Sequence, residues 1–95
     1  MKVFITPAAN SNIAQIGSWI AADNPKRAIS FMIELKKACE KIGDAPRGSV
    51  VVQRYVQFEI RRKPYHDYLI FYRIKNNTVE ILHVIHGARD YSKLF

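Results

Sequence analysis

The chain has 95 residues, 48% of them hydrophobic, and a formal net charge of +7 at pH 7. This length predicts one domain spanning residues 1–95, and the apolar content excludes a disordered chain. No apolar run approaches the roughly 20 residues that cross a bilayer, so no membrane partner is expected. A signal peptide is not expected either, which makes the cytoplasm the default compartment. The single cysteine, Cys39, cannot form an internal disulfide and is predicted to be a small core residue.

A short strand and two helices are predicted in the first half of the chain. Residues 3–5 form the strand, and Thr6-Pro7 supplies a capping side chain and a first-turn proline. The inner face of this helix is marked by apolar residues at helical spacing, namely Ala9, Ile13, Ile16 and Ile20. Asn24-Pro25 repeats the same signal for a second helix, which Gly43 ends. The short link between the two helices predicts a helical hairpin.

Three strands are predicted in the second half. Residues 56–60 alternate between apolar and polar side chains, which predicts a strand with one solvated face. Residues 68–74 and 79–85 are apolar on both faces, as central strands are, and the link between them contains two asparagines that tolerate positive φ. The order β-α-α-β-β-β predicts an α+β fold, with an antiparallel helical hairpin packed on one face of a mainly antiparallel sheet. The first strand is expected at an edge or between the later strands.

The positive charge indicates a nucleic-acid or acidic protein partner, or else a basic surface without a special ligand. The densest run is Arg61-Arg62-Lys63, with Tyr65 and Tyr68 nearby. Tyrosines at this spacing pack in cores or across strands more often than they stack on bases. The charge pattern does not distinguish RNA, DNA and protein as the partner.

Residue types that mark other chemistries are sparse. No Cys/His cluster has metal-ligand spacing and no Gly-rich phosphate loop is present, so no metal or cofactor is predicted. Glu34 and Glu40 are expected on a solvated helix face. His83 is expected as a partly buried strand residue with a satisfied hydrogen bond. His86 lies at the strand exit, and on a regular strand it faces the side opposite to His83.

An ordered series of short blocks carries a family resemblance. The last strand ends in His86-Gly87-Ala88-Arg89-Asp90, followed by an apolar tail. The series comprises Thr6–Ala9, Ile16–Ala21, Asn24–Ala28, Pro46–Gly48, Tyr65, Tyr68–Arg73 and Val79–Asp90. Together these blocks resemble the ParE branch of the ParE/RelE superfamily, the toxins of bacterial type II toxin–antitoxin pairs. The resemblance covers essentially the whole chain and implies the fold derived above.

The resemblance implies one of two activities. ParE-like members trap the cleaved-DNA complex of DNA gyrase, whereas RelE-like members are ribosome-dependent endoribonucleases. The chain has Leu69 where the nucleases usually have an arginine, and Phe95 where they have a tyrosine, while Arg89 matches an arginine of the nuclease set. These departures favour a non-enzymatic gyrase toxin without catalytic residues. The alternative is a nuclease in which His86, Arg89 and Arg61 do the chemistry.

Two interaction sites are expected. The target-binding segment is expected at the C-terminus, because a monomer gains little from keeping an exposed-looking mix of cationic and apolar side chains there; its residues are Arg89, Tyr91, Lys93, Leu94 and Phe95. An internal Arg89–Asp90 ion pair that anchors the tail is equally compatible. A small antitoxin with an acidic C-terminal half is expected to fold onto the helical hairpin and a sheet edge, giving a hetero-oligomer. Its predicted contacts are Trp19, which is expected at the rim of the core, and Lys26, Arg27, Arg61 and Arg62.

Overall fold

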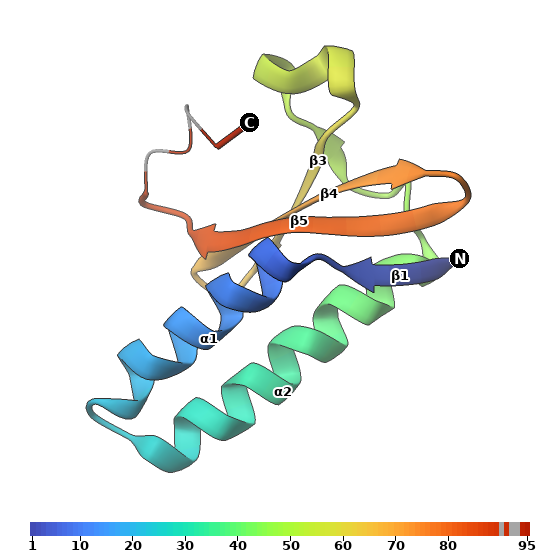
Figure 1. Ribbon diagram of the computed structural model, residues 1–95. Coiled ribbons are helices and arrows are strands. Elements are labelled where there is room, and N and C mark those ends of the chain that lie inside the picture. The colour runs from blue at the N-terminus through green and yellow to red at the C-terminus, as the bar shows by residue number, and fades with distance from the viewer. Residues whose placement is uncertain (90, 92–93) are drawn as a thin grey trace.

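The computed structural model describes residues 1–89, 91, 94 and 95. The elements in chain order are β1 (Lys2–Ile5), α1 (Pro7–Ala21), α2 (Pro25–Lys41), η1 (Ile42–Asp44), β2 (Val50–Val51), η2 (Gln53–Phe58), β3 (Arg61–Tyr65), β4 (Tyr68–Lys75) and β5 (Thr78–His86). The strands form one sheet in the order β1-β5-β4-β3-β2. The two helices form a hairpin on one face of this sheet (Figure 1). The predicted α+β architecture is confirmed.

Both helices begin at the predicted caps. The Thr6 Oγ1 accepts the backbone N–H of Ala9 at 3.2 Å, and the Asn24 Oδ1 accepts that of Arg27 at 3.1 Å. Each cap satisfies a donor that the first turn of a helix would otherwise leave unpaired. The Thr6 hydroxyl also donates to the carbonyl of Ile81 at 2.6 Å. The start of α1 is therefore tied directly to β5.

The main core lies between the helical hairpin and the sheet. Gly17 permits the close approach of α1 and α2, because a Cβ on this residue would overlap the side chain of Met32. Cys39 is completely buried, as predicted for a small core residue. The other fully buried or nearly buried members of this core are Ala9, Ile13, Ile16, Phe31, Leu35, Ile42, Ile70, Tyr72, Val79, Ile81 and Val84. No helix in the described part of the chain is long and apolar enough to cross a membrane.

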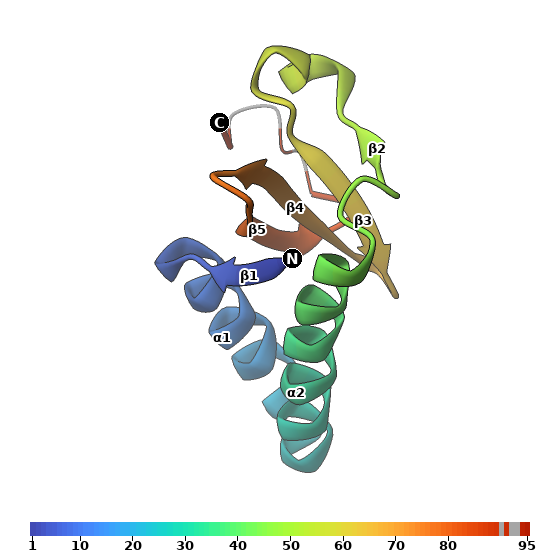
Figure 2. The same cartoon turned by 90° about the vertical axis from the view of Figure 1, so that its right-hand side faces the viewer.

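The central strands β4 and β5 form an antiparallel hairpin. Asn76 and Asn77 at its turn have φ values of 52° and 58°, the left-handed conformation that two-residue hairpin turns need. β1 lies at one edge of the sheet and pairs in parallel with the first half of β5. The edge position, one of two expected from the sequence, follows from α1 continuing directly from β1 beneath the sheet (Figure 2).

The predicted strand over residues 56–60 is wrong. Residues 53–58 form the 3₁₀ segment η2, Glu59 has a φ of 52°, and β3 begins only at Arg61. Val56 and Phe58, which the alternating pattern placed on the core face, are each 53% exposed. The buried residue of η2 is Tyr55, whose hydroxyl donates to the carbonyl of Tyr91 at 2.8 Å. Packing of Tyr55 against the sheet therefore prevails over the local two-residue period.

A second, smaller core covers the other face of the sheet. Its buried members are Val52, Tyr55, Ile60, Phe71 and Ile85, and Leu69, Leu82, Tyr91 and Leu94 pack against them. We call this side of the sheet the outer face. In Figures 1 and 2, η2 and the end of the chain lie on the side of the sheet away from the helical hairpin. The molecule thus has a helical layer, a sheet, and a partial third layer of η2 and the tail.

Candidate functional site

A cavity of about 430 Å³ lies between α1 and the end of β5. We call it the hairpin groove. The lining residues are Asn12, Gln15, Ile16, Trp19, Tyr68, Val84, Ile85, His86 and Arg89. Trp19 is 79% exposed, which confirms its predicted position outside the core. An indole with so much surface in water, next to an apolar cavity, is typical of a protein interaction site.

Asn12 organises one wall of the hairpin groove. β1 pairs with β5 only as far as Ile81, so the remainder of that β5 edge has no strand neighbour. The Asn12 Oδ1 accepts the backbone N–H of Val84 at 3.0 Å and lies 3.1 Å from the His83 Nδ1. The Val84 N–H identifies this atom as the amide oxygen, which has no hydrogen to donate, so the His83 Nδ1 carries the hydrogen. His83 therefore has the predicted strand position and hydrogen bond.

His83 favours the neutral state. Burial lowers the pKa of its imidazole below the usual value, and the nearby Arg89 guanidinium lowers it further. His83 pairs with Phe71 and contacts the Phe95 ring, which places it on the outer face, whereas His86 pairs with Tyr68 on the helical face. A bulge at Leu82 precedes both histidines, so their opposite orientation is kept.

The residues of the alternative nuclease site are not all brought together. His86 and Arg89 line the hairpin groove. Arg61 pairs with Tyr72 on β4, four residues from Tyr68, which pairs with His86. This offset separates Arg61 from His86 by about 13 Å along the strands alone. The Arg61 guanidinium instead donates to the carbonyl of Ser49 at 2.7 Å.

The basic run at the start of β3 is divided between the two faces of the sheet. Arg61 pairs with Tyr72 of the main core, and Lys63 lines a cavity beside α2. Arg62 pairs with Phe71 and therefore lies on the outer face. The three adjacent cations in the sequence do not form one patch.

A second cavity, of about 410 Å³, opens on the outer face beside Arg62. We call it the outer-face pocket. The residues that line it are Val50, Val51, Val52, Gln53, Arg54, Arg62 and Tyr91. The Arg62 Nη1 donates to the Tyr91 Oη at 3.0 Å. Two guanidinium groups and a phenol thus meet in a concave site with a valine wall.

The comparisons with known proteins agree with this architecture. A family model described as the ParE toxin of type II toxin-antitoxin system, parDE, matches residues 3–91. The chain belongs to the ParE toxin family. Its fold is similar to that of a solved structure titled chromosomal ParDE TA system from P. aeruginosa, with a TM-score of 0.78 and 13% identity. The match covers 90% of this chain and 95% of that chain. No curated protein sequence matches the chain.

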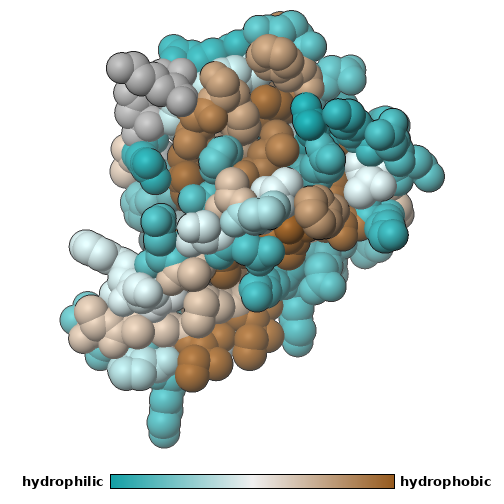
Figure 3. Space-filling model, in the orientation of Figure 1, coloured by the Kyte–Doolittle hydropathy of each residue, from teal (hydrophilic) through white to brown (hydrophobic). Residues whose placement is uncertain are grey.

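The tail of this ParE-family chain packs against the sheet. The Phe95 ring lies 4.8 Å from Tyr55 and 5.8 Å from Phe71, and the Tyr91 ring lies 5.0 Å from Phe71. Apolar residues gather in the upper part of the face that Figure 3 shows. The sequence analysis inferred target binding because a monomer gains little from keeping such a tail, but these contacts give the tail a packing role.

The predicted target-binding residues therefore differ in accessibility. Arg89 is exposed, Tyr91 and Leu94 are half-buried, and Phe95 is 40% exposed. Lys93 and Asp90, and with Asp90 the predicted ion pair to Arg89, lie outside the described residues. Arg89 is the described member of the set that places an exposed cation beside the hairpin groove.

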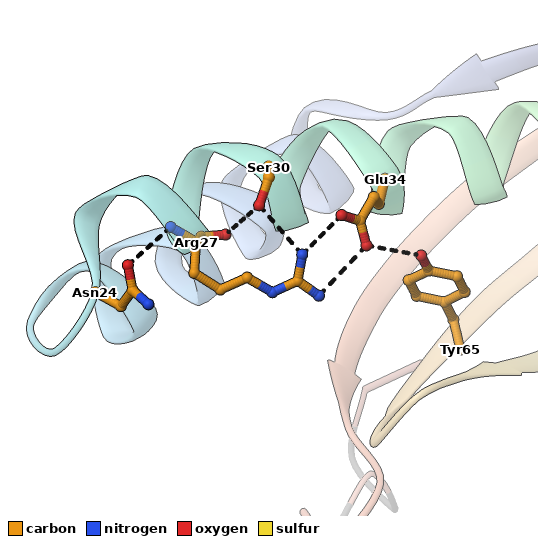
Figure 4. Close-up of polar contacts among 5 residues, drawn as sticks. All are labelled: Asn24, Arg27, Ser30, Glu34 and Tyr65. Carbon is orange, nitrogen blue, oxygen red and sulfur yellow. Dashed lines mark hydrogen bonds and ion pairs between the residues drawn. The ribbon is translucent and has the colours of Figure 1, made fainter.

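The predicted antitoxin contacts Lys26 and Arg27 are exposed at the start of α2. Arg27 forms a two-pronged ion pair with Glu34, at 2.7 and 3.3 Å, and bonds to Ser30 (Figure 4). This pairing lowers the pKa of the Glu34 carboxyl. Glu34 is thus half-buried and paired, and not simply solvated as expected. Arg62 lies on the opposite side of the sheet, so the predicted contacts do not share one surface.

Two residues of the candidate sites in this ParE-family protein escaped the sequence analysis. Asn12 looked like an ordinary polar helix residue, and Arg54 lay inside a segment whose structure was unassigned. The signal for Asn12 in the sequence was its position directly before Ile13, a residue of the apolar inner face of α1. Among the described residues, no group of three or more histidine, cysteine, aspartate or glutamate side chains could hold a metal ion. Independence from metals and cofactors stays a prediction.

Proposed function

We propose that this ParE-family chain is a toxin that inhibits DNA gyrase by stabilising its cleaved-DNA complex, and that a cognate antitoxin neutralises it. The family match over residues 3–91 carries the proposal, since type II toxin–antitoxin membership is what that family denotes. A non-enzymatic mode of action is supported by the wide separation of Arg61 from His86 and Arg89. Binding, rather than catalysis, is then what the toxin contributes.

The gyrase contact is centred on Arg89. This residue is exposed at the mouth of the hairpin groove, close to the apolar side chains of Ile16 and Ile85. An exposed cation beside an apolar cavity suits a protein surface with an acidic residue next to an apolar one. Tyr91, Lys93, Leu94 and Phe95 complete the proposed contact, and the half-buried members hold the segment against the sheet.

A plasmid cleavage assay tests this contact. Purified protein, DNA gyrase, ATP and supercoiled plasmid should give linear plasmid after detergent and protease treatment. Arg89→Ala should reduce the linear product at least about tenfold, since a hydrogen-bonded charge contributes that much. Lys75→Ala is the matched control, because it removes an exposed cation at the opposite end of the β4–β5 hairpin. Equal trapping by wild type and Arg89→Ala would disprove the role of Arg89.

The same assay separates the two activities that the superfamily offers. Plasmid that remains supercoiled in the presence of folded protein would contradict the gyrase proposal. Cleavage of mRNA on purified ribosomes would then identify the nuclease alternative. In that case His86→Ala and Arg89→Ala should each abolish cleavage, whereas Arg61→Ala should not, because Arg61 is bonded to the loop at Ser49.

The antitoxin is proposed to bind the helical layer. Ile29 and Ile33 lie one turn apart on α2 and are 60% and 51% exposed, and Lys26 and Lys36 are exposed on the same helix. Apolar side chains flanked by cations fit an amphipathic acidic helix. Trp19, Lys26 and Arg27 belong to this surface. A segment that continued to the β2–β3 edge would approach Arg61 and Arg62.

Substitution of Trp19 tests antitoxin binding. Trp19→Ala should weaken the complex with the co-expressed neighbouring gene product about tenfold or more, because an exposed tryptophan typically dominates an interface. Phe58→Ala is the matched control, an exposed aromatic residue on η2, far from the helical layer. Loss of binding in both variants, or in neither, would contradict this placement. Calorimetry on the purified pairs gives the affinities.

A further inference from the structure

The outer-face pocket brings Arg62 and Tyr91 together with Arg54, a cation that the proposed gyrase and antitoxin contacts do not include. Arg54 and Arg62 line it together with the Tyr91 hydroxyl, and none of the described lining residues is acidic. We propose that this pocket binds a phosphate group of the DNA backbone. The choice of DNA as the source of the phosphate rests on the proposed action at gyrase-bound DNA.

The hydroxyl of Tyr91 is held ready to donate. Its oxygen accepts an N–H from Arg62 at 3.0 Å, so its own hydrogen is available to a ligand. The backbone of Tyr91 is fixed by the Tyr55 hydroxyl at 2.8 Å, and its ring packs 5.0 Å from Phe71. Arg62 is half-buried, whereas Arg54 is exposed at the entrance. Arg62 and the Tyr91 hydroxyl are therefore ordered before any ligand arrives, which lowers the entropic cost of binding.

The chemistry of the pocket matches a phosphodiester. Guanidinium groups bind phosphate oxygens with paired hydrogen bonds, and two of them converge here with a third donor. A volume of about 410 Å³ holds more than a bare phosphate, and the valine wall offers an apolar surface to a sugar. Arg47 and Arg61 line a separate cavity together with Glu59, on the face of the sheet that carries Tyr72, and so do not extend this pocket.

An acidic antitoxin segment is a poorer match for this pocket. The exposed apolar residues of the helical layer, Trp19, Ile29 and Ile33, are separated from Arg62 by the sheet. A helix bound along them would not reach the pocket.

The test is fluorescence anisotropy with the purified full chain and labelled duplex DNA, without gyrase, over a series of salt concentrations. Arg54→Ala and Arg62→Ala should each weaken binding about tenfold and reduce the salt slope by about one. Tyr91→Phe should weaken binding several-fold with an unchanged slope, because no charge is lost. Lys75→Ala, the distant cation control, should leave affinity within about twofold. Arg62→Lys should keep the slope and lose affinity, because lysine lacks the guanidinium fork.

Several outcomes would overturn the proposal. Equal losses in Arg62→Ala and Lys75→Ala would indicate a diffuse charge field with no specific pocket. Tighter binding of RNA, or of free ATP or inorganic phosphate over DNA, would reassign the phosphate source. Weakened antitoxin binding with unchanged DNA binding in Arg62→Ala would assign the pocket to the acidic partner. Because gyrase is absent, failure here leaves the plasmid cleavage result unaffected, and failure of plasmid cleavage leaves this binding assay interpretable.

Discussion

Asn12 shows how one side chain positions several others. Its oxygen accepts the Val84 N–H where β5 has no strand neighbour, and it fixes the hydrogen on the Nδ1 of His83. The Nε2 of His83 is left as an acceptor, and the His83 ring lies 5.4 Å from that of Phe95. A single helical amide therefore links α1, the free edge of β5 and the outer face.

The lowered pKa of His83 predicts a stability that depends on pH. In the folded state the His83 imidazole takes up its proton only at a pH below its usual pKa of 6.5. Just below pH 6.5, the unfolded chain therefore binds more protons than the folded chain does. The free energy of unfolding should therefore rise with pH through this window and fall on acidification. Urea unfolding between about pH 5 and 7 measures this dependence. His83→Asn keeps a donor for Asn12 and should lose this part of the dependence; an identical slope in both proteins would contradict the prediction.

The thiol of Cys39 is predicted to be unreactive in the folded protein. The residue is completely buried, and burial raises the pKa of its thiol to about 12. Thiolate, the reactive form, is therefore scarce at neutral pH. A thiol reagent should label Cys39 only in denaturant, and the rate of labelling there should equal the rate of unfolding. Rapid labelling of the native protein would show that this part of α2 opens readily.

At the scale of elements, the chain turns after α2 at a crowded glycine. A Cβ on Gly43 would overlap the backbone carbonyl of Met1 and approach the side chain of Val3, and the N-terminal amine donates to the Gly43 carbonyl at 2.9 Å. β1 is therefore locked against η1. No glycine in the described part of the chain has a positive φ, so space and not backbone conformation limits this site.

Gly43→Ala should destabilise the protein by about 1–3 kcal/mol, the typical cost of forcing extra atoms into a packed site. Gly48→Ala is the matched control, because Gly48 is exposed and its nearest contact is the carbonyl of Ala45 at 3.2 Å. Denaturant midpoints measure both. Equal effects of the two substitutions would show that the region around Met1 rearranges to accept a methyl group.

At the scale of the whole molecule, the tail determines how the outer face is covered. Phe95 contacts three rings that belong to different elements, Tyr55 of η2, Phe71 of β4 and His83 of β5. Without these contacts the second core would be open to water along one side. The tail therefore stabilises the second core, and Tyr91 within it lines the outer-face pocket.

Phe95→Ala should lower the free energy of unfolding by about 1–2 kcal/mol, since only part of the ring is buried. Phe58→Ala should change it by less than about 0.5 kcal/mol, because Phe58 is 53% exposed. The comparison between Phe95→Ala and Phe58→Ala matters for toxicity tests. A loss of killing by Phe95→Ala can come from a lost target contact or from a destabilised fold. A stability change no larger than that of Phe58→Ala would assign the tail to target binding alone.

Strong local signals were enough to predict most of the elements. Thr6 and Asn24 each combine a capping oxygen with a following proline, which predicts the start of each helix. Asn76 and Asn77 fit a hairpin turn, which predicts the β4–β5 pair. These elements can therefore be predicted from residues that are adjacent in the sequence. The family resemblance followed from the order of those elements and the block that ends in Arg89-Asp90.

Only the tertiary structure decided which side chains meet. Tyr55 packs on a sheet face built from distant residues, and this long-range contact makes η2 a 3₁₀ segment where alternation predicted a strand. Strand pairing sends Arg62 to one face and Arg61 to the other, although they are adjacent in the chain. Register, sheet order and the path of the tail depend on non-local contacts. The sequence by itself therefore determined the helices, the β4–β5 hairpin and the family, and the three-dimensional packing determined η2, the sheet order and the two sites.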